Sequence, residues 1–416
     1  MRNGIIFLLG AGASKDAGLP ITNELFDLLE RSFDDELNQA PSDVKQSIEL
    51  ERALLSFVRD RMQKADSVFF DPNNFEDIVT TIDELGFRFR NRLLPFVDSW
   101  AEELKSFDTS PNSNFEDFFR VVPPEQKEQT RTLLKRMSRE PQGLAFQRLA
   151  HRIRKGIRRW LITDSYLKNS NYLAKLSEFG EEVDVFTLNY DLTVEAALTQ
   201  NNISYSTGFT QEIMTDVFSK QEKKIGVWNP EESFKINTKV KLHKLHGSLS
   251  WFRSLQRDDQ QEIVELPSNR FNELFGDEFN GFQNWADWNG TEPPSMVFGV
   301  EHKLAGYEPY LTLFSRFAQK LRNAELLVVI GCQWQNEKIA HGLITRELSK
   351  REDPLTLIEV TKSDKEPFNQ LLTCGAKEAL ETGKLKSAVV EMQTSRRERQ
   401  ELQQRLSGSG LRHWEN

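Results

Sequence analysis

The sequence predicts an α/β protein with a doubly wound, mostly parallel sheet that is interrupted by a large α-helical insertion. Three observations lead to this prediction. Short, continuous apolar runs recur along the chain, and several of them end at glycine or small polar residues. Helical periodicity follows most of these runs, and this alternation is typical of βαβ units. Between the first two runs lies a long stretch with helical periodicity alone.

The expected elements follow one another in chain order. The run Ile5–Leu9 predicts a buried strand, and periodic leucines from Thr22 onward predict the helix after it. Prolines divide the insertion into separate helices. The later strands are expected at 183–188, up to about 246, at 324–331 and at 355–360, with helices at 192–198, 307–323 and 336–350 and a polar loop at 254–295. The sheet domain is therefore assigned to 1–33 and 179–386, the helical insertion to 34–178, and a C-terminal helical tail to 387–416. The start of that tail, SAVVEM, predicts a strand before the charged helix.

Composition restricts the kind of protein further. The 416 residues carry a net charge of −9, which argues against direct, strong binding to nucleic acid. No apolar run approaches the ~18 residues of a membrane span, and the N-terminal run is too short for a signal peptide. We therefore expect a cytoplasmic protein without membrane contact. Two cysteines, Cys332 and Cys374, cannot form a zinc site alone.

The stretch IIFLLGAGASKDAGLPIT, residues 5–22, makes a bare turn directly after the first strand. A strand, a glycine turn and a helix together hold a pyrophosphate in many α/β folds. Glycine lets the ligand approach the backbone, and N–H groups at the helix start bind the anion. Gly10, Ala11, Gly12 and Ser14 are therefore candidate phosphate-binding residues. The spacing differs from the strict dinucleotide motif, and the alternative is a tight turn without a ligand.

Polar residues also follow two later strands, Asn189 and Asp191 after one, and His246, Gly247 and Ser248 after the other. Ligands of open α/β sheets lie at the carboxyl ends of strands, so these residues should face the same crevice as the glycine turn. An amide can hold water or a sugar hydroxyl, and a histidine can act as a general base. The alternatives are a helix-capping aspartate and a structural histidine.

A second glycine, Gly331, ends another buried strand and is followed by Cys332. The other half of a dinucleotide could lie there. His243 and Trp251 are assigned to packing, and the charged tail to a solvated helix face.

Together, these motifs resemble those of the sirtuin family. The family's Gly-Ala-Gly loop, its Thr-Gln-Asn-x-Asp motif, its His-Gly pair and its late Gly-Thr/Tyr-Ser loop correspond in order to Gly10-Ala11-Gly12, Thr187–Asp191, His246-Gly247 and Gly331–Gln333. The resemblance covers the sheet domain only. Deacetylating sirtuins hold zinc with two Cys-x-x-Cys pairs, and because this chain has no such pair we expect no zinc.

The resemblance implies a Rossmann-like domain that takes NAD⁺ as its substrate, as in the bacterial sirtuin-like NAD⁺ hydrolases of antiphage defence. Asn189 would hold a ribose hydroxyl or water, His246 would act as base, and Asp191 would bind the nicotinamide carboxamide. Gly247, Ser248, Gly331 and Cys332 would complete the pocket. The products would be ADP-ribose and nicotinamide.

The resemblance also implies regulation by assembly, as a homo-oligomer and with a HerA-type hexameric ATPase. Two alternatives stay open. One is an NAD-dependent protein deacylase or ADP-ribosyltransferase. The other is a non-catalytic NAD- or ADP-ribose-binding scaffold for a nuclease or ATPase.

Overall fold

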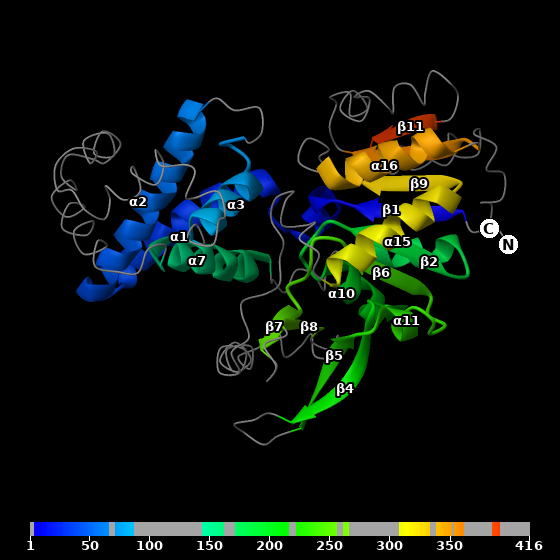
Figure 1. Ribbon diagram of the computed structural model, residues 1–416, viewed down its shortest axis with the longest axis horizontal. Coiled ribbons are helices and arrows are strands. Elements are labelled where there is room, and N and C mark those ends of the chain that lie inside the picture. The colour runs from blue at the N-terminus through cyan, green and yellow to red at the C-terminus, as the bar shows by residue number, and fades with distance from the viewer. Residues whose placement is uncertain are drawn as a thin grey trace, which may run out of the picture. The chain divides into compact units, whose positions relative to one another are not determined.

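The computed structural model describes residues 4–65, 71–86, 144–161, 171–215, 222–255, 261–265, 308–332, 338–351, 353–361 and 385–391. The chain divides into two compact units (Figure 1). One contains the start of the chain as far as Leu19 together with the described residues from 171 onward. The other contains the described residues between Pro20 and Thr163.

A seven-stranded sheet forms the centre of the first unit, in the order β11-β10-β9-β1-β2-β6-β3. Each neighbouring pair is parallel. The strands are β1 (Ile5–Leu9), β2 (Val183–Thr187), β3 (Tyr205–Ser206), β6 (Val240–Lys244), β9 (Leu326–Ile330), β10 (Leu355–Thr361) and β11 (Leu385–Glu391). Without the short edge strand β3, this is the 3-2-1-4-5-6 order of a Rossmann fold. The predicted fold class is confirmed.

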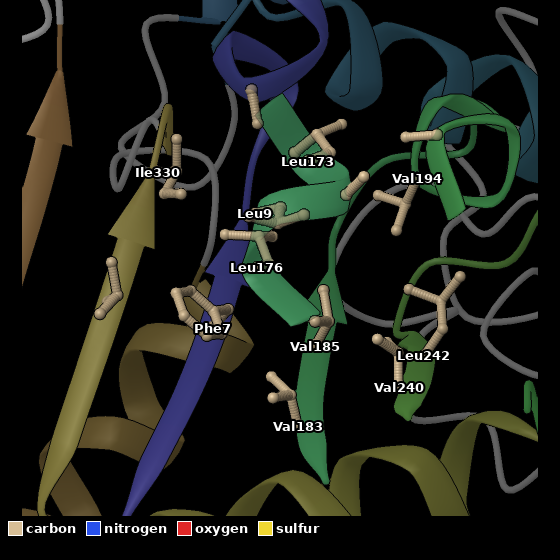
Figure 2. Close-up of a cluster of buried hydrophobic side chains, with 14 of the residues drawn as sticks. Phe7, Leu9, Leu173, Leu176, Val183, Val185, Val194, Val240, Leu242 and Ile330 are labelled. Carbon is tan, nitrogen blue, oxygen red and sulfur yellow. The ribbon is translucent and has the colours of Figure 1, made fainter. Parts of the chain in front are cut away.

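Helices cover both faces of this sheet. On one face, α9 (Asn171–Ala174), the 3₁₀ turn η6 (Lys175–Phe179) and α10 (Thr193–Gln200) pack apolar side chains onto the strands, as Figure 2 shows around Phe7 and Val185. On the other face, Phe186 of β2 packs against Phe317 of α15 (Tyr310–Asn323), with ring centroids 4.8 Å apart. The helix α16 (Lys338–Lys350) lies beside α15. The central strands β1 and β9 are covered on both faces and are apolar throughout, which is why they appear in the sequence as continuous runs.

The same unit contains a second sheet that the sequence did not predict. Its four antiparallel strands are β4 (Phe209–Thr215), β5 (Glu222–Trp228), β8 (Gln261–Glu265) and β7 (Trp251–Leu255), in that spatial order, with α11 (Pro230–Ser233) after β5. Residues 254–255 and 261–265, expected to be loop, are strand, and the rest of 254–295 lies outside the described residues. These strands mix charged and apolar residues, so they give no continuous apolar run.

The second unit is helical, as the sequence predicts for its region. Its helices are α1 (Leu25–Gln39), α2 (Ser42–Ala65), α3 (Phe75–Gly86) and α7 (Leu144–Leu161), preceded by the 3₁₀ turn η2 (Thr22–Glu24). Phe26 of α1 meets Phe75 of α3 edge to face, with ring centroids 5.1 Å apart. Arg152 of α7 forms ion pairs with Glu36 of α1 and Glu51 of α2.

The two units do not divide at the boundaries assigned from the sequence. Residues 20–33, assigned there to the sheet domain, belong to the helical unit, because α1 buries Phe26 and Phe33 among its helices. Residues 387–391 fall in the segment assigned to the tail, but they form a strand as its beginning predicts and complete β11 of the sheet, and 392–416 lie outside the described residues. Among the described helices, none has the length and apolar character needed to cross a membrane.

Candidate functional site

The candidate site lies at the carboxyl edge of the parallel sheet, where β1, β2, β6 and β9 end side by side. Three backbone hydrogen bonds align these ends: Gly10 N–H to Ile330 O (2.9 Å), Leu188 N–H to Leu9 O (2.8 Å) and Leu245 N–H to Thr187 O (2.9 Å). The loops that carry the four sequence motifs therefore all begin at the carboxyl edge of the sheet, next to one another. The expectation that these motifs share one edge of the sheet is met.

The glycine turn after β1 runs into a 3₁₀ helix, η1 (Ala11–Ala17), and it lies directly against the loop after β9. The N–H of Gly12 donates to the carbonyl oxygen of Gly331 over 2.9 Å. A Cβ atom on Gly12 would lie 2.8 Å from Gly331 Cα, and one on Gly10 would lie 2.6 Å from Cys332 Cα. Contact between the two backbones is therefore enough to explain why this turn consists of residues without bulky side chains, and no bound ligand is needed to explain it.

Gly331 completes this contact from the other side. It has φ of +63°, and a Cβ atom there would lie 2.4 Å from the backbone nitrogen of Ala13. The contact falls between β1 and β9, where the strand order reverses, which is where ligands of doubly wound sheets bind. Gly12 itself stays exposed. However, the N–H groups of Gly10, Gly12 and Ala13 already donate to protein carbonyls, so these three are not free to cradle a phosphate.

Asn189 joins the loop after β2 to the glycine turn. Its side-chain nitrogen Nδ2 donates to Gly10 O over 2.8 Å and to Ser14 Oγ over 3.1 Å. Both amide hydrogens are used in these bonds, so the side chain can offer a ligand only its carbonyl oxygen Oδ1. Asn189 is 8% exposed and Ser14 is 2% exposed, which fixes both groups in place.

Asp191 combines the two roles considered from the sequence. Its Oδ1 accepts the N–H of Thr193, the first residue of α10, over 2.9 Å, so this oxygen supports the start of the helix from the position before the N-cap Leu192. The second carboxylate oxygen remains the candidate for a nicotinamide carboxamide. That role stays a prediction.

His246 lies in the turn after β6, next to the Asn189 segment. Its ring centroid is 6.1 Å from that of Tyr190, and Leu249 N–H donates to Tyr190 O over 2.9 Å. Gly247 permits this turn because its φ is +91°. His246 is 1% exposed, so any molecule it deprotonates must be bound against it inside the fold. Ser248 is buried as well, and its hydroxyl lies 2.9 Å from that of Ser250.

A buried charged cluster, which the sequence did not reveal, lies beneath these loops. The ammonium of Lys244, at the end of β6, donates to Glu195 Oε1 over 2.7 Å and to the backbone carbonyl of Asp191. Burial raises the pKa of the Glu195 carboxyl, and the Lys244 ammonium offsets only part of that increase. The sequence offered no signal beyond a lysine at the end of the predicted strand, because β6 itself reads VKLHK and alternates apolar with basic residues.

Glu265 of β8 lies close enough to this pair to interact with it electrostatically. Burial raises the pKa of its carboxyl to about 7. Thr207 Oγ1 and Trp251 Nε1 donate to its two oxygens over 2.6 and 3.0 Å. Through Trp251, the second sheet is connected to the residues that follow His246.

His243 takes the packing role assigned to it. It is stacked on Phe186, with ring centroids 4.3 Å apart, and its Nε2 lies 2.9 Å from Asp184 Oδ1. Burial lowers its pKa, although the Asp184 carboxylate opposes this effect. Trp251 is fully buried, as predicted.

Comparisons with known proteins give weak similarities only. No protein-family model matches the sequence, and no curated protein matches it significantly. The chain is similar to a solved Sir2 structure in complex with the inhibitor EX-527, 2′-O-acetyl-ADP-ribose and a deacetylated p53 peptide, at 14% identity over 98% of this chain and 94% of that chain, with a TM-score of 0.32.

Two further solved structures are similar at the same level. Sir2Tm bound to a propionylated peptide is 14% identical over 98% of this chain and 93% of its own, with a TM-score of 0.31. A Sir2 enzyme studied for mechanism and regulation is 12% identical over 91% of this chain and 90% of its own, with a TM-score of 0.29. At these values, function must be argued from the residues of this chain.

Proposed function

We propose that this protein hydrolyses the nicotinamide–ribose bond of NAD⁺, releasing ADP-ribose and nicotinamide. One observation carries the proposal. The Asn189 amide is bonded to the glycine turn over 2.8 Å, while the residue after it accepts a backbone bond from the His246 turn. An amide, a glycine turn and an imidazole thus gather at the carboxyl edge of a Rossmann-type sheet.

The chemistry suits these groups. Cleavage of a glycosidic bond passes through an oxocarbenium-like transition state, which requires a positioned ribose and a nucleophile on the face opposite the leaving group. Asn189 Oδ1 would accept a hydrogen bond from a ribose hydroxyl or from the attacking water. His246 would take the proton as the water oxygen bonds to the ribose carbon. Nicotinamide would leave as a neutral molecule with the electron pair of the broken bond.

The remaining residues would bind the ends of the dinucleotide. The second carboxylate oxygen of Asp191 would accept the carboxamide N–H of nicotinamide. The pyrophosphate would lie at Gly12, which is exposed beside the Gly331–Cys332 loop. Since several N–H groups of the turn are already paired, the phosphate contact would involve fewer backbone donors than a full glycine cradle.

The test is nicotinamide release from NAD⁺ by the purified chain, followed by chromatography. Asn189→Ala and His246→Ala should each lower the rate by about 100-fold or more, as expected for groups that orient or deprotonate the nucleophile. Asn323→Ala is the matched control, because Asn323 ends α15 just before β9, at the opposite edge of the same sheet. It should leave the rate unchanged.

Two other results would each contradict hydrolysis. Acetyl-ADP-ribose or a modified protein as product would show a deacylase or an ADP-ribosyltransferase. Binding of NAD⁺ or ADP-ribose without any NAD⁺ loss in the parent chain or the variants would show a scaffold.

We further propose a cellular role, which depends on the proposed hydrolysis of NAD⁺. The hydrolase would deplete NAD⁺ upon phage infection. Assembly as a homo-oligomer and with a HerA-type ATPase would control it, so that the enzyme stays inactive in uninfected cells. Co-expression with that ATPase should change both the mass of the complex and the rate of nicotinamide release. If light scattering shows no change in mass and the rate of nicotinamide release does not change either, the proposed control by the ATPase is wrong.

A further inference from the structure

A single buried side chain connects the two loops that carry Asn189 and His246. Lys244 is fully buried at the last position of β6, two residues before His246. Its ammonium reaches the backbone carbonyl of Asp191, two residues after Asn189. Its own carbonyl oxygen accepts the N–H of Gly247 over 3.3 Å. Lys244 therefore contacts both loops, one through its side chain and the other through its backbone.

The segment 188–191 has no regular secondary structure, so each residue is held by its own contact. Leu188 N–H donates to Leu9, Asn189 N–H to the Thr187 hydroxyl over 3.0 Å, and Tyr190 O accepts from Leu249. The carbonyl of Asp191 is held by the Lys244 ammonium. Without that donor, a carbonyl in a buried segment would lose its partner, which costs free energy comparable to a lost hydrogen bond.

Stability alone does not require an ion pair at this place. Lys244 is fully buried and Glu195 is 3% exposed, and their nitrogen and oxygen lie 2.7 Å apart. Replacing a buried ion pair by apolar residues of similar volume is often neutral or stabilising, whereas removing one partner is strongly destabilising. What an apolar pair cannot supply is the hydrogen bond to Asp191 O.

We infer that Lys244 is a positioning residue: its ammonium, neutralised by Glu195, fixes the Asp191 carbonyl and thereby holds Asn189 in register with the glycine turn and with His246. This inference rests on the proposed NAD⁺ hydrolysis for its kinetic consequence. Its structural consequence, the ordering of residues 188–193, is independent of any activity.

Three variants separate positioning from stability. Lys244→Met removes the ammonium at similar volume and leaves Glu195 buried alone, so it should lower the melting temperature most. Lys244→Met combined with Glu195→Leu should recover most of that loss without restoring the bond to Asp191. Glu195→Gln is the comparison variant: it keeps an acceptor for the ammonium and leaves the Asp191 bond in place, but it removes the neutralising charge and should therefore lower the melting temperature.

The kinetic readout is the separation of kcat from KM for NAD⁺. The double variant should lose about 10- to 100-fold in kcat with little change in KM, since misplacement of a reacting group by about 1 Å has effects of this size. Glu195→Gln keeps the Asp191 bond and should therefore lose less kcat than the double variant, although it removes the charge that neutralises the ammonium. A double variant that recovers stability and also keeps the parent kcat would overturn the inference.

Amide hydrogen exchange provides the second readout and does not depend on turnover. In the double variant, peptides covering 188–193 should exchange faster, while β2 stays as protected as in the parent chain. Unchanged exchange in 188–193 would overturn the inference even in an active protein. A parent chain without NAD⁺ turnover would refute the proposed function, and faster exchange in the double variant would then still support the positioning role.

Discussion

The two halves of the carboxyl edge are built from opposite kinds of contact. Between β1 and β9, the glycine half consists of Gly10, Gly12 and Gly331, where one backbone lies directly on another. Next to β2 and β6, the charged half consists of Lys244 and Glu195, with Glu265 nearby, where buried charged side chains are added to the backbone bonds between the strand ends. The glycine half has no space for a side chain, whereas the charged half depends on matched partners. Adding any side chain should therefore destabilise the glycine half, whereas the charged half should be destabilised only when its balance of charge changes.

The largest expected effect comes from breaking the glycine half with Gly331→Ala. The new Cβ atom would lie 2.4 Å from Ala13 N, at a residue whose φ is +63°. Backbone strain and the clash together should cost about 4 kcal/mol of unfolding free energy. Urea denaturation followed by tryptophan fluorescence measures it, and a loss below about 1 kcal/mol would show that the two loops separate easily.

The second effect tests the charged half through pH. The carboxyl of Glu265 has an ordinary pKa of 4.5, and burial raises it to about 7. The folded state thus holds a proton that the unfolded state releases, so this contribution to stability is complete below pH 4.5, falls between pH 4.5 and 7, and is lost above that. The free energy of unfolding should therefore decrease by about 3 kcal/mol between pH 4.5 and 7 because of this carboxyl.

Glu265→Gln is the control for this pH effect. Glutamine can still accept from Trp251 Nε1 and can donate to the Thr207 hydroxyl, so the local bonds are kept without the titration. The difference in unfolding free energy between the parent and Glu265→Gln should therefore change by about 3 kcal/mol between pH 4.5 and 7. A difference that does not vary with pH would place the ionised carboxylate in a well-solvated environment.

A smaller effect concerns the support of the glycine half. The hydroxyl of Tyr172, on α9, donates to the carbonyl oxygen of Ala13 within η1. Tyr172→Phe removes this donor from a buried carbonyl and should lower the unfolding free energy by about 1 kcal/mol. Thermal melts of parent and variant measure the change, and equal melting temperatures would mean that water replaces the hydroxyl.

The smallest effect has the opposite sign and serves as the control for Gly331→Ala. Gly342 lies within α16, is exposed, and a Cβ atom there would meet no atom within 4 Å. Gly342→Ala should stabilise the protein by about 0.5–1 kcal/mol, because alanine loses less backbone entropy than glycine in a helix. Destabilisation here would show that adding a methyl group is unfavourable in general, and would weaken the comparison between the two halves.

The central sheet was predictable because parallel strands are buried on both faces. The strand expected at 324–331 is β9 at Leu326–Ile330, and the one expected at 183–188 is β2 at Val183–Thr187. The antiparallel sheet was missed because its strands combine apolar and charged residues. In β5, for example, Lys223 and Lys224 precede Ile225, so neither a continuous apolar run nor a clear alternation marks the strand.

The candidate site was predictable in its position and only partly in its chemistry. Polar residues after buried strands indicated the correct edge, because the carboxyl ends of parallel strands always meet there. The sequence did not indicate that Asn189 uses both amide hydrogens within the protein, or that Lys244 pairs with Glu195. Such pairings join distant segments and leave no periodic pattern.

By itself, the sequence determined the α/β class, the order of the motifs and the glycines of the first turn, since these follow from local periodicity and local conformational freedom. Only the tertiary structure decided why those glycines are needed. Gly10 and Gly12 are bare because Gly331 and Cys332, from the other end of the chain, lie against them. Contact between segments so far apart depends on how the strands are ordered in the sheet, and strand order is a property of the whole fold.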